Sequence, residues 1–126
     1  ALFANKDMAT ACSALRDAIS IIEKISDAKL DRMLGDVWGN LGCALDRLGG
    51  NSLDAESAHC AGLVAYGRAG LSKDDPTWTK AWRNLCVSVK AQGSKAKPID
   101  KLWESIDQQV RGIVPMTQVA SVKIHV

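Results

Sequence analysis

Residues 38–49 read WGNLGCALDRLG, and residues 82–93 read WRNLCVSVKAQG. The two stretches align without gaps. Each has Trp-x-Asn-Leu, then a small residue, an aliphatic residue four positions after the Leu and a Gly eight positions after it. Trp and Leu three residues apart share one face of an α-helix, and glycine accepts the left-handed conformation that often follows a helix. The repeated stretch therefore predicts two similar amphipathic helices, each closed by a glycine.

Apolar residues recur at helical spacing through most of the chain, and a two-residue alternation is sustained only at residues 119–126. We expect an all-α fold of about five antiparallel helices, with helical hairpins stacked as a short array or a compact bundle. A single helical domain would span residues 1–115, and residues 116–126 would form a C-terminal tail. The first four expected helices cover residues 5–26, 27–48, 53–69 and 76–92. The last expected helix begins at Pro98, and Gly112 and Pro115 end the helical region.

Local signals sharpen this outline. Asp75-Pro76 is a strong helix start, because aspartate caps a helix and proline is harmless at the first helical position. The third helix is rich in small residues, with Ala58 and Gly62 four apart, so another backbone can approach it closely. Four of the six aromatic residues are Trp, and we expect them to be core residues rather than a ligand-binding cluster. The first helix should bury the stripe Met8, Cys12, Leu15, Ile19, Ile22 and Ile25, which Ile21 widens.

Composition limits the function classes. The chain has 126 residues, 47% of them hydrophobic and 24% charged, which fits one globular domain. Its apolar stretches are far shorter than the roughly 20 residues of a membrane span, so we expect no membrane segment. The net charge of +2 is too small to favour nucleic acid, but the basic residues gather in residues 73–126, which would attract an acidic partner. A nucleic-acid site lacks interleaved exposed aromatic residues at its candidate lysines, Lys90, Lys95, Lys97 and Lys101.

The cysteines and histidines indicate no metal, no cofactor and no enzyme. The four cysteines form no Cys-x-x-Cys pair. Neither His59 nor His125 has a nucleophile or carboxylate at a spacing that suggests catalysis, so His59 is interpreted as a partly buried polar contact. Cys43 and Cys60 are nearly symmetric about the turn at residues 50–51. A disulfide between them is conceivable in a secreted chain, but buried free thiols and a cytoplasmic location are preferred.

The repeated stretch resembles the first helix of a tetratricopeptide repeat, which reads Trp-x-x-Leu-Gly-x-x-Tyr before a glycine turn. The resemblance covers residues 36 to about 111 and implies two stacked helical hairpins, with the first helix as a cap. The copies depart from the family in being 44 residues apart instead of 34. In the later copy Leu102 and Ser105 match the packing positions of the second helix and Pro98 replaces an alanine, whereas Ala58 stands where the earlier copy should have a large residue.

Repeats of this family bind peptides or protein segments in a concave groove lined by their first helices. The resemblance therefore implies a scaffold or adaptor domain that binds an acidic protein or peptide segment. Asn40 and Asn84 would hold a peptide backbone or a carboxylate, and Lys80 and Arg83 would pair with an acidic end. The alternative is a compact secreted or pathogen-derived helical bundle that binds a host or receptor protein. The partner-binding residues that the resemblance implies are Asn40, Arg47, Lys80, Arg83, Asn84 and Lys90, among neighbours Asp36, Gly39, Cys43 and Val87.

Overall fold

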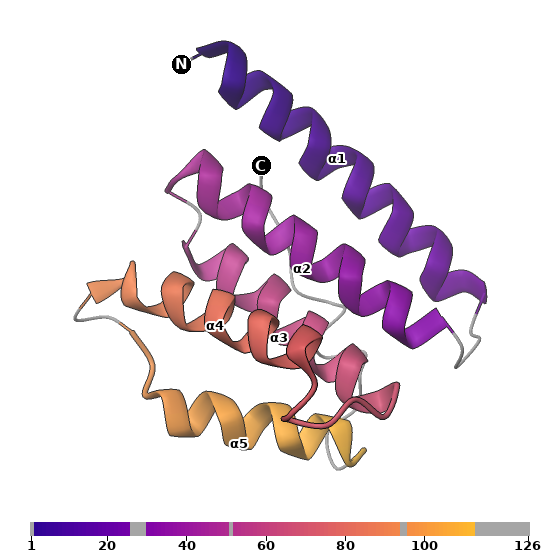
Figure 1. Cartoon of the computed structure of the whole chain (residues 1–126). Helices are drawn as coiled ribbons and strands as arrows, with labels where there is room; N and C mark the ends of the chain where they lie inside the picture. Colours follow the sequence, from indigo (N-terminus) through magenta and orange to yellow (C-terminus); the bar gives the residue numbers. More distant parts are fainter. Residues whose placement is uncertain (1, 26–29, 51, 94–95, 113–126) are drawn as a thin grey trace.

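The computed structural model describes residues 2–25, 30–50, 52–93 and 96–112, with side chains from residue 7 onward. These residues form five helices and no strand, which confirms the all-α class. Successive helices run antiparallel (Figure 1). The predicted tail and His125 lie outside the described residues. The helices are α1 (Leu2–Ile25), α2 (Asp31–Leu48), α3 (Ser52–Arg68), α4 (Pro76–Lys90) and α5 (Ile99–Val110).

The predicted helix ends are confirmed at two places. The Asp75 side chain accepts a hydrogen bond of 2.9 Å from the backbone N–H of Thr77 and so caps α4. After α2, Gly49 and Gly50 have φ angles of 73° and 71°, the left-handed region that glycine enters without steric cost. The predicted start of the second helix at residue 27 lies outside the described residues.

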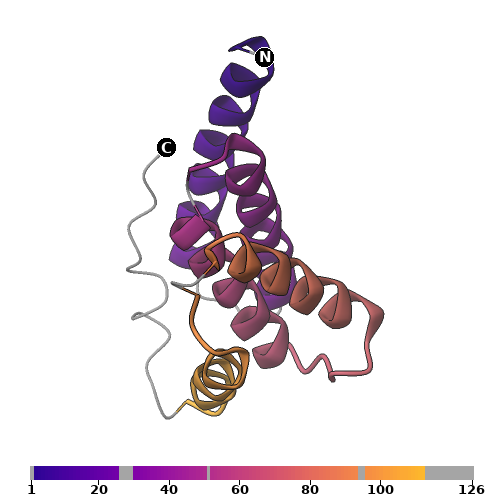
Figure 2. The ribbon, with the colours of Figure 1, turned by 90° about the vertical axis from the view of Figure 1, so that its left-hand side faces the viewer.

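Helix α3 is the centre of the molecule. Ten of its 17 residues are buried, so it has no solvated face along most of its length. Its alanines join one apolar cluster with α1 and α2, and Leu63, Val64 and Tyr66 join a second cluster with α4 and α5. One buried helix thus connects both halves of the core. Figure 2 shows α1 and α5 at opposite ends of the stack.

The contact between α2 and α3 is close because glycines meet there. A Cβ atom on Gly62 would lie only 3.2 Å from the Gly35 carbonyl oxygen and 3.3 Å from the Gly39 nitrogen. Gly42 lies against the ring of His59, where a Cβ would come within 2.6 Å of the imidazole. The predicted close backbone approach at the third helix is therefore confirmed.

The contact between α4 and α5 is wider. The backbone of α5 lies closer to α3 than to α4. Trp78 and Trp82 of α4 pack against Trp103 of α5 with ring centroids 5.6 and 5.9 Å apart. Large side chains between two helices increase the distance between their axes. The tryptophans therefore hold this second helix pair apart.

Helix α1 packs mainly on α2 and covers one end of the stack. Cys12 and Ile19 are buried, and Met8, Leu15 and Ile22 are partly buried, as the stripe predicted. The prediction is wrong for Ile25, which is 57% exposed, and Ile21 is 60% exposed. Contact with a single helix buries a narrower stripe than the sequence pattern offers. None of the described helices combines the length and apolar character needed to cross a membrane.

Candidate functional site

A groove lies between α2 and α4, which run in the same direction (Figure 1). It encloses a cavity of about 420 Å³. Helices α2 and α4 form the walls and α3 forms the floor. The residues that matter most for the groove are Asn40, Lys80 and Asn84 on the walls and His59, Gly62 and Tyr66 on the floor.

Small residues keep the groove open. Gly39 lines the cavity, and no atom of another helix lies within 4 Å of the place its Cβ would occupy. Ala81 contributes only a methyl group from the opposite wall. Gly62 allows the backbone of α2 to lie close to α3 at the floor of the groove.

The structure brings three of the six predicted partner-binding residues into the cavity wall: Asn40, Lys80 and Asn84. Asn40 and Lys80 are exposed, and Asn84 is half-buried. Their neighbours Asp36, Gly39 and Cys43 also line the cavity. The other three predicted residues, Arg47, Arg83 and Lys90, are exposed on the same two helices but do not line the cavity.

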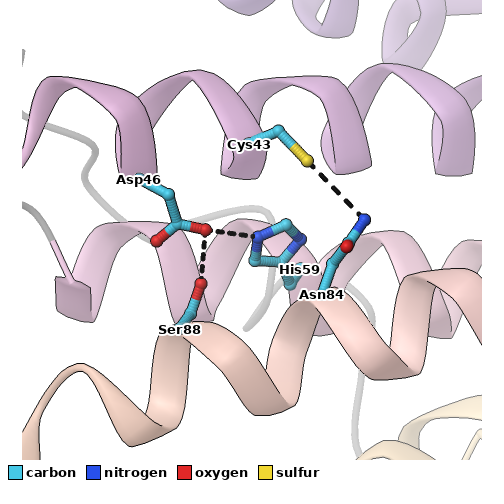
Figure 3. Close-up of polar contacts among 5 residues, drawn as sticks. All are labelled: Cys43, Asp46, His59, Asn84 and Ser88. Carbon is cyan, nitrogen blue, oxygen red and sulfur yellow. Dashed lines mark hydrogen bonds and ion pairs between the residues drawn. The ribbon is translucent and has the colours of Figure 1, made fainter.

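A direct contact joins the two walls. Asn84 Nδ2 donates to the Cys43 Sγ across 3.6 Å (Figure 3). Burial raises the pKa of the Cys43 thiol, and the Asp46 carboxylate raises it further. Cys43 is therefore a protonated, weakly nucleophilic thiol at neutral pH. All four cysteines carry free thiols, as preferred from the sequence, and no bond joins Cys43 to Cys60.

One groove carboxylate is held from the floor. The Tyr66 hydroxyl donates a short hydrogen bond to Asp36 Oδ1. Burial raises the pKa of Tyr66 above its ordinary range, and the hydrogen bond and charge of Asp36 raise it further. Tyr66 therefore stays a neutral donor, and it occupies an Asp36 oxygen that a ligand would otherwise use.

A polar trio of two buried residues and one half-buried residue lies next to the groove. His59 Nε2 lies 3.0 Å from Asp46 Oδ2, and the Ser88 hydroxyl donates to the same oxygen across 2.6 Å (Figure 3). His59 is 1% exposed and Ser88 is fully buried. The three residues come from α3, α2 and α4, so the trio fixes both walls on the floor.

The chemistry of the trio determines which imidazole nitrogen carries the proton. An ionised carboxylate only accepts hydrogen bonds, so Nε2 of His59 must be the donor to Asp46. In the neutral ring Nδ1 is then an acceptor, and no described residue hydrogen-bonds to it. Figure 3 shows this nitrogen on the side of the ring that faces Asn84.

The trio is not arranged for nucleophilic catalysis. In a Ser-His-Asp triad the imidazole takes the serine proton, whereas Ser88 here donates to the carboxylate. Ser88 is also fully buried, so no substrate can reach its oxygen. Among the described residues, no group of three or more His, Cys, Asp or Glu side chains is placed to hold a metal ion.

The carboxylates and the cations around the groove differ in whether they have partners within the fold. Asp36 and Asp46 both accept hydrogen bonds from inside the fold. In contrast, none of the predicted cations forms an ion pair with a described residue. Lys80 in the cavity wall, and Arg47, Arg83 and Lys90 elsewhere on the same two helices, thus lack an ion-pair partner among the described residues.

Comparison with known proteins finds no significant match, whether with protein families, curated proteins or solved structures.

Two polar clusters were missed by the sequence analysis. Asp46 accepts hydrogen bonds from His59, 13 residues away in the chain, and from Ser88, 42 residues away, and only the packing of three helices brings these residues together. Glu56, near the start of α3, is only 3% exposed. It accepts from Gln92 at 2.7 Å and from Lys97 at 3.5 Å. Lys97, one of the candidate lysines for nucleic-acid binding, is therefore paired with Glu56. Lys95, another of those candidates, lies outside the described residues. A polar residue between apolar helix positions was the only available signal.

Proposed function

We propose that this chain is a protein-interaction domain whose groove binds an extended acidic segment of a partner protein. The observation that carries the proposal is a difference between the charged groups: Asp36 and Asp46 accept hydrogen bonds from inside the fold, while the predicted cations of α2 and α4 form no ion pair with a described residue. A carboxylate-bearing segment supplies the missing acceptors. The parallel direction of α2 and α4 over α3 supports the resemblance to stacked tetratricopeptide-like repeats, and with it a scaffold role.

Each group has a distinct task in this proposal. The side-chain amides of Asn40 and Asn84 both donate and accept, so they suit the alternating N–H and C=O groups of an extended backbone. Lys80 and Arg83 lie on the same helix within one turn and suit acidic side chains or a terminal carboxylate. These contacts define a polar site that selects sequence by charge.

The expected affinity is modest. Exposed ion pairs contribute about 0.2–1 kcal/mol each, so four cations speed association and set specificity more than they tighten binding. We expect dissociation constants on the order of micromolar for short segments. Raising the ionic strength should weaken binding, because salt screens exposed charges.

Selection from a random displayed-peptide library tests the proposal without a known partner. The wild-type chain should enrich peptides rich in Asp and Glu. Fluorescence anisotropy of a selected peptide should then show affinity losses of about two- to fivefold for Arg83→Ala and of up to about tenfold for Asn84→Ala. Gly39→Trp should abolish binding, because its side chain would project into open cavity space.

Two variants serve as matched controls. Gly39→Ala adds only a methyl group and should retain binding. Lys101→Ala removes an exposed cation from α5, far from the groove, and should also bind normally. Enrichment of peptides without acidic residues, or normal binding by folded Gly39→Trp, would overturn the proposal.

A further inference from the structure

A second cavity lies beside the tryptophans, at the other end of the molecule from α1. Trp78 and Trp103 both line it, with their ring planes at 82° and their centroids 5.6 Å apart. The cavity has a volume of about 190 Å³ and is closed at the side by Asp107 of α5. Trp78 is buried, but Trp103 and the neighbouring Trp82 are only half-buried. The prediction that all four tryptophans are core residues therefore describes Trp38 and Trp78 better than the other two.

An ammonium group already occupies the edge of this cavity. Lys73, in the connector between α3 and α4, places Nζ 3.8 Å from the centre of the Trp103 ring. Aromatic faces attract cations through their quadrupole, and this distance is well within the range of that attraction. Lys73 itself shows that the Trp103 face accepts a cation.

The lysine side chain is lightly held. Its backbone carbonyl accepts a hydrogen bond from Thr79, so the connector is fixed. Its ammonium forms no ion pair with a described residue and is exposed. The side chain can therefore swing into water while the cavity keeps its shape.

We propose that this cavity binds a methylated ammonium group of a ligand, with Lys73 as the internal competitor. Two aromatic walls at a right angle suit the round, weakly hydrated shape of such a cation better than that of a neutral alkyl group. Asp107 adds a carboxylate to the same cavity, although Arg111 shares it at 3.1 Å. The site is separate from the α2–α4 groove and does not depend on the function proposed there.

Tetramethylammonium is the direct probe. In ¹H–¹⁵N spectra of the full chain, the indole N–H signals of Trp78 and Trp103 should shift saturably, with a dissociation constant on the order of millimolar. The Trp38 signal, on the other side of α3, should not move. Lys73→Met keeps an unbranched side chain only one atom shorter, removes its charge, and should tighten binding about two- to fivefold.

Two further measurements keep the result decisive. Trp103→Phe keeps an aromatic ring in the cluster and should weaken binding several-fold, while Lys80→Ala in the groove should have no effect. The neutral isostere 3,3-dimethylbutan-1-ol should bind much more weakly than choline. Binding of trimethyl-lysine amide and of phosphocholine then distinguishes a protein source from a lipid source. Equal affinity for the neutral isostere, or no saturable shift in folded Lys73→Met, would overturn the proposal.

Discussion

The first helices of the pairs α2–α3 and α4–α5 contain the same Trp-x-Asn-Leu stretch, but the two pairs pack in opposite ways. In the first pair, glycines of both helices meet, and the Gly62 position lies 3.2 Å from the backbone of α2. In the second pair, three tryptophans fill the space and α5 rests on α3 instead. The shared stretch supplies buried side chains to each first helix and places a glycine after its end. The side chains of the second helix decide how closely the pair packs.

The wide pair should be the more sensitive to loss of volume. Trp78→Ala removes a buried ring that contacts both other tryptophans, and we expect a loss of about 3–5 kcal/mol in the free energy of unfolding. Chemical denaturation measures it. Val87→Ala, on the exposed face of the same helix, is the control and should cost little. A small loss for Trp78→Ala would mean that the tryptophans do not set the spacing of α4 and α5.

The close pair should be the more sensitive to added volume. In Gly42→Ala the new methyl group would lie 2.6 Å from the ring of His59, which Asp46 holds in place. Overpacking of this kind costs about 1–3 kcal/mol, more than the gain in helix propensity. Thermal unfolding should therefore occur at a lower temperature. An unchanged melting temperature would show that α2 and α3 can separate without cost.

The polar trio connects the close pair to α4. Ser88→Ala removes one of the two donors to Asp46, and we expect a loss of about 1.5 kcal/mol. Ser13→Ala, at an exposed helical position, should leave the free energy of unfolding nearly unchanged. If urea denaturation gives the same stability for both variants, the trio does not fix the walls of the groove.

Substitution of Gly39 should change the free energy of unfolding in the opposite direction to substitution of Gly42, which lies on the same helix. No atom of another helix would contact a methyl group at this position, so Gly39→Ala should gain up to about 1 kcal/mol through helix propensity. The pair Gly39→Ala and Gly42→Ala therefore compares open and closed positions within one turn of α2. A loss of stability in Gly39→Ala would contradict an open groove.

The smallest effect on stability at neutral pH is expected from the Cys60 thiol. Cys60 packs against the α4–α5 side of the core. Burial raises the pKa of its thiol from 9.0 to about 12, and the Glu56 charge adds to the rise. The folded state therefore keeps its proton after the unfolded state has lost it, so this contribution to stability is present below pH 9 and declines between about pH 9 and 12. The free energy of unfolding should decline less steeply between about pH 9 and 12 for Cys60→Ala than for the wild-type chain. Equal slopes would show that the Cys60 thiol is not desolvated.

Much of the fold follows from local signals in the sequence. The Asp75-Pro76 start, the glycines after Leu48 and the small residues of α3 each depend on neighbours in the chain, and each is confirmed. The exposure of Ile21 and Ile25 could not be predicted this way, because it depends on how many helices contact α1.

The candidate site was less predictable for a related reason. Asn40, Lys80 and Asn84 could be placed together because the repeat puts equivalent positions on parallel helices. The trio of Asp46, His59 and Ser88 could not, because its members hold no equivalent positions in the two copies. To predict a polar contact among three helices, one must know how all three helices are aligned along one another.

The central claim is that the groove between α2 and α4 is the surface that meets the partner. Titration of the ¹⁵N-labelled chain with a selected acidic peptide tests it most directly. The account predicts that the largest shifts occur at the side-chain amides of Asn40 and Asn84 and at the backbone amides of Gly39 and Lys80. Shifts concentrated on α1 or α5, with these four signals unchanged, would contradict it.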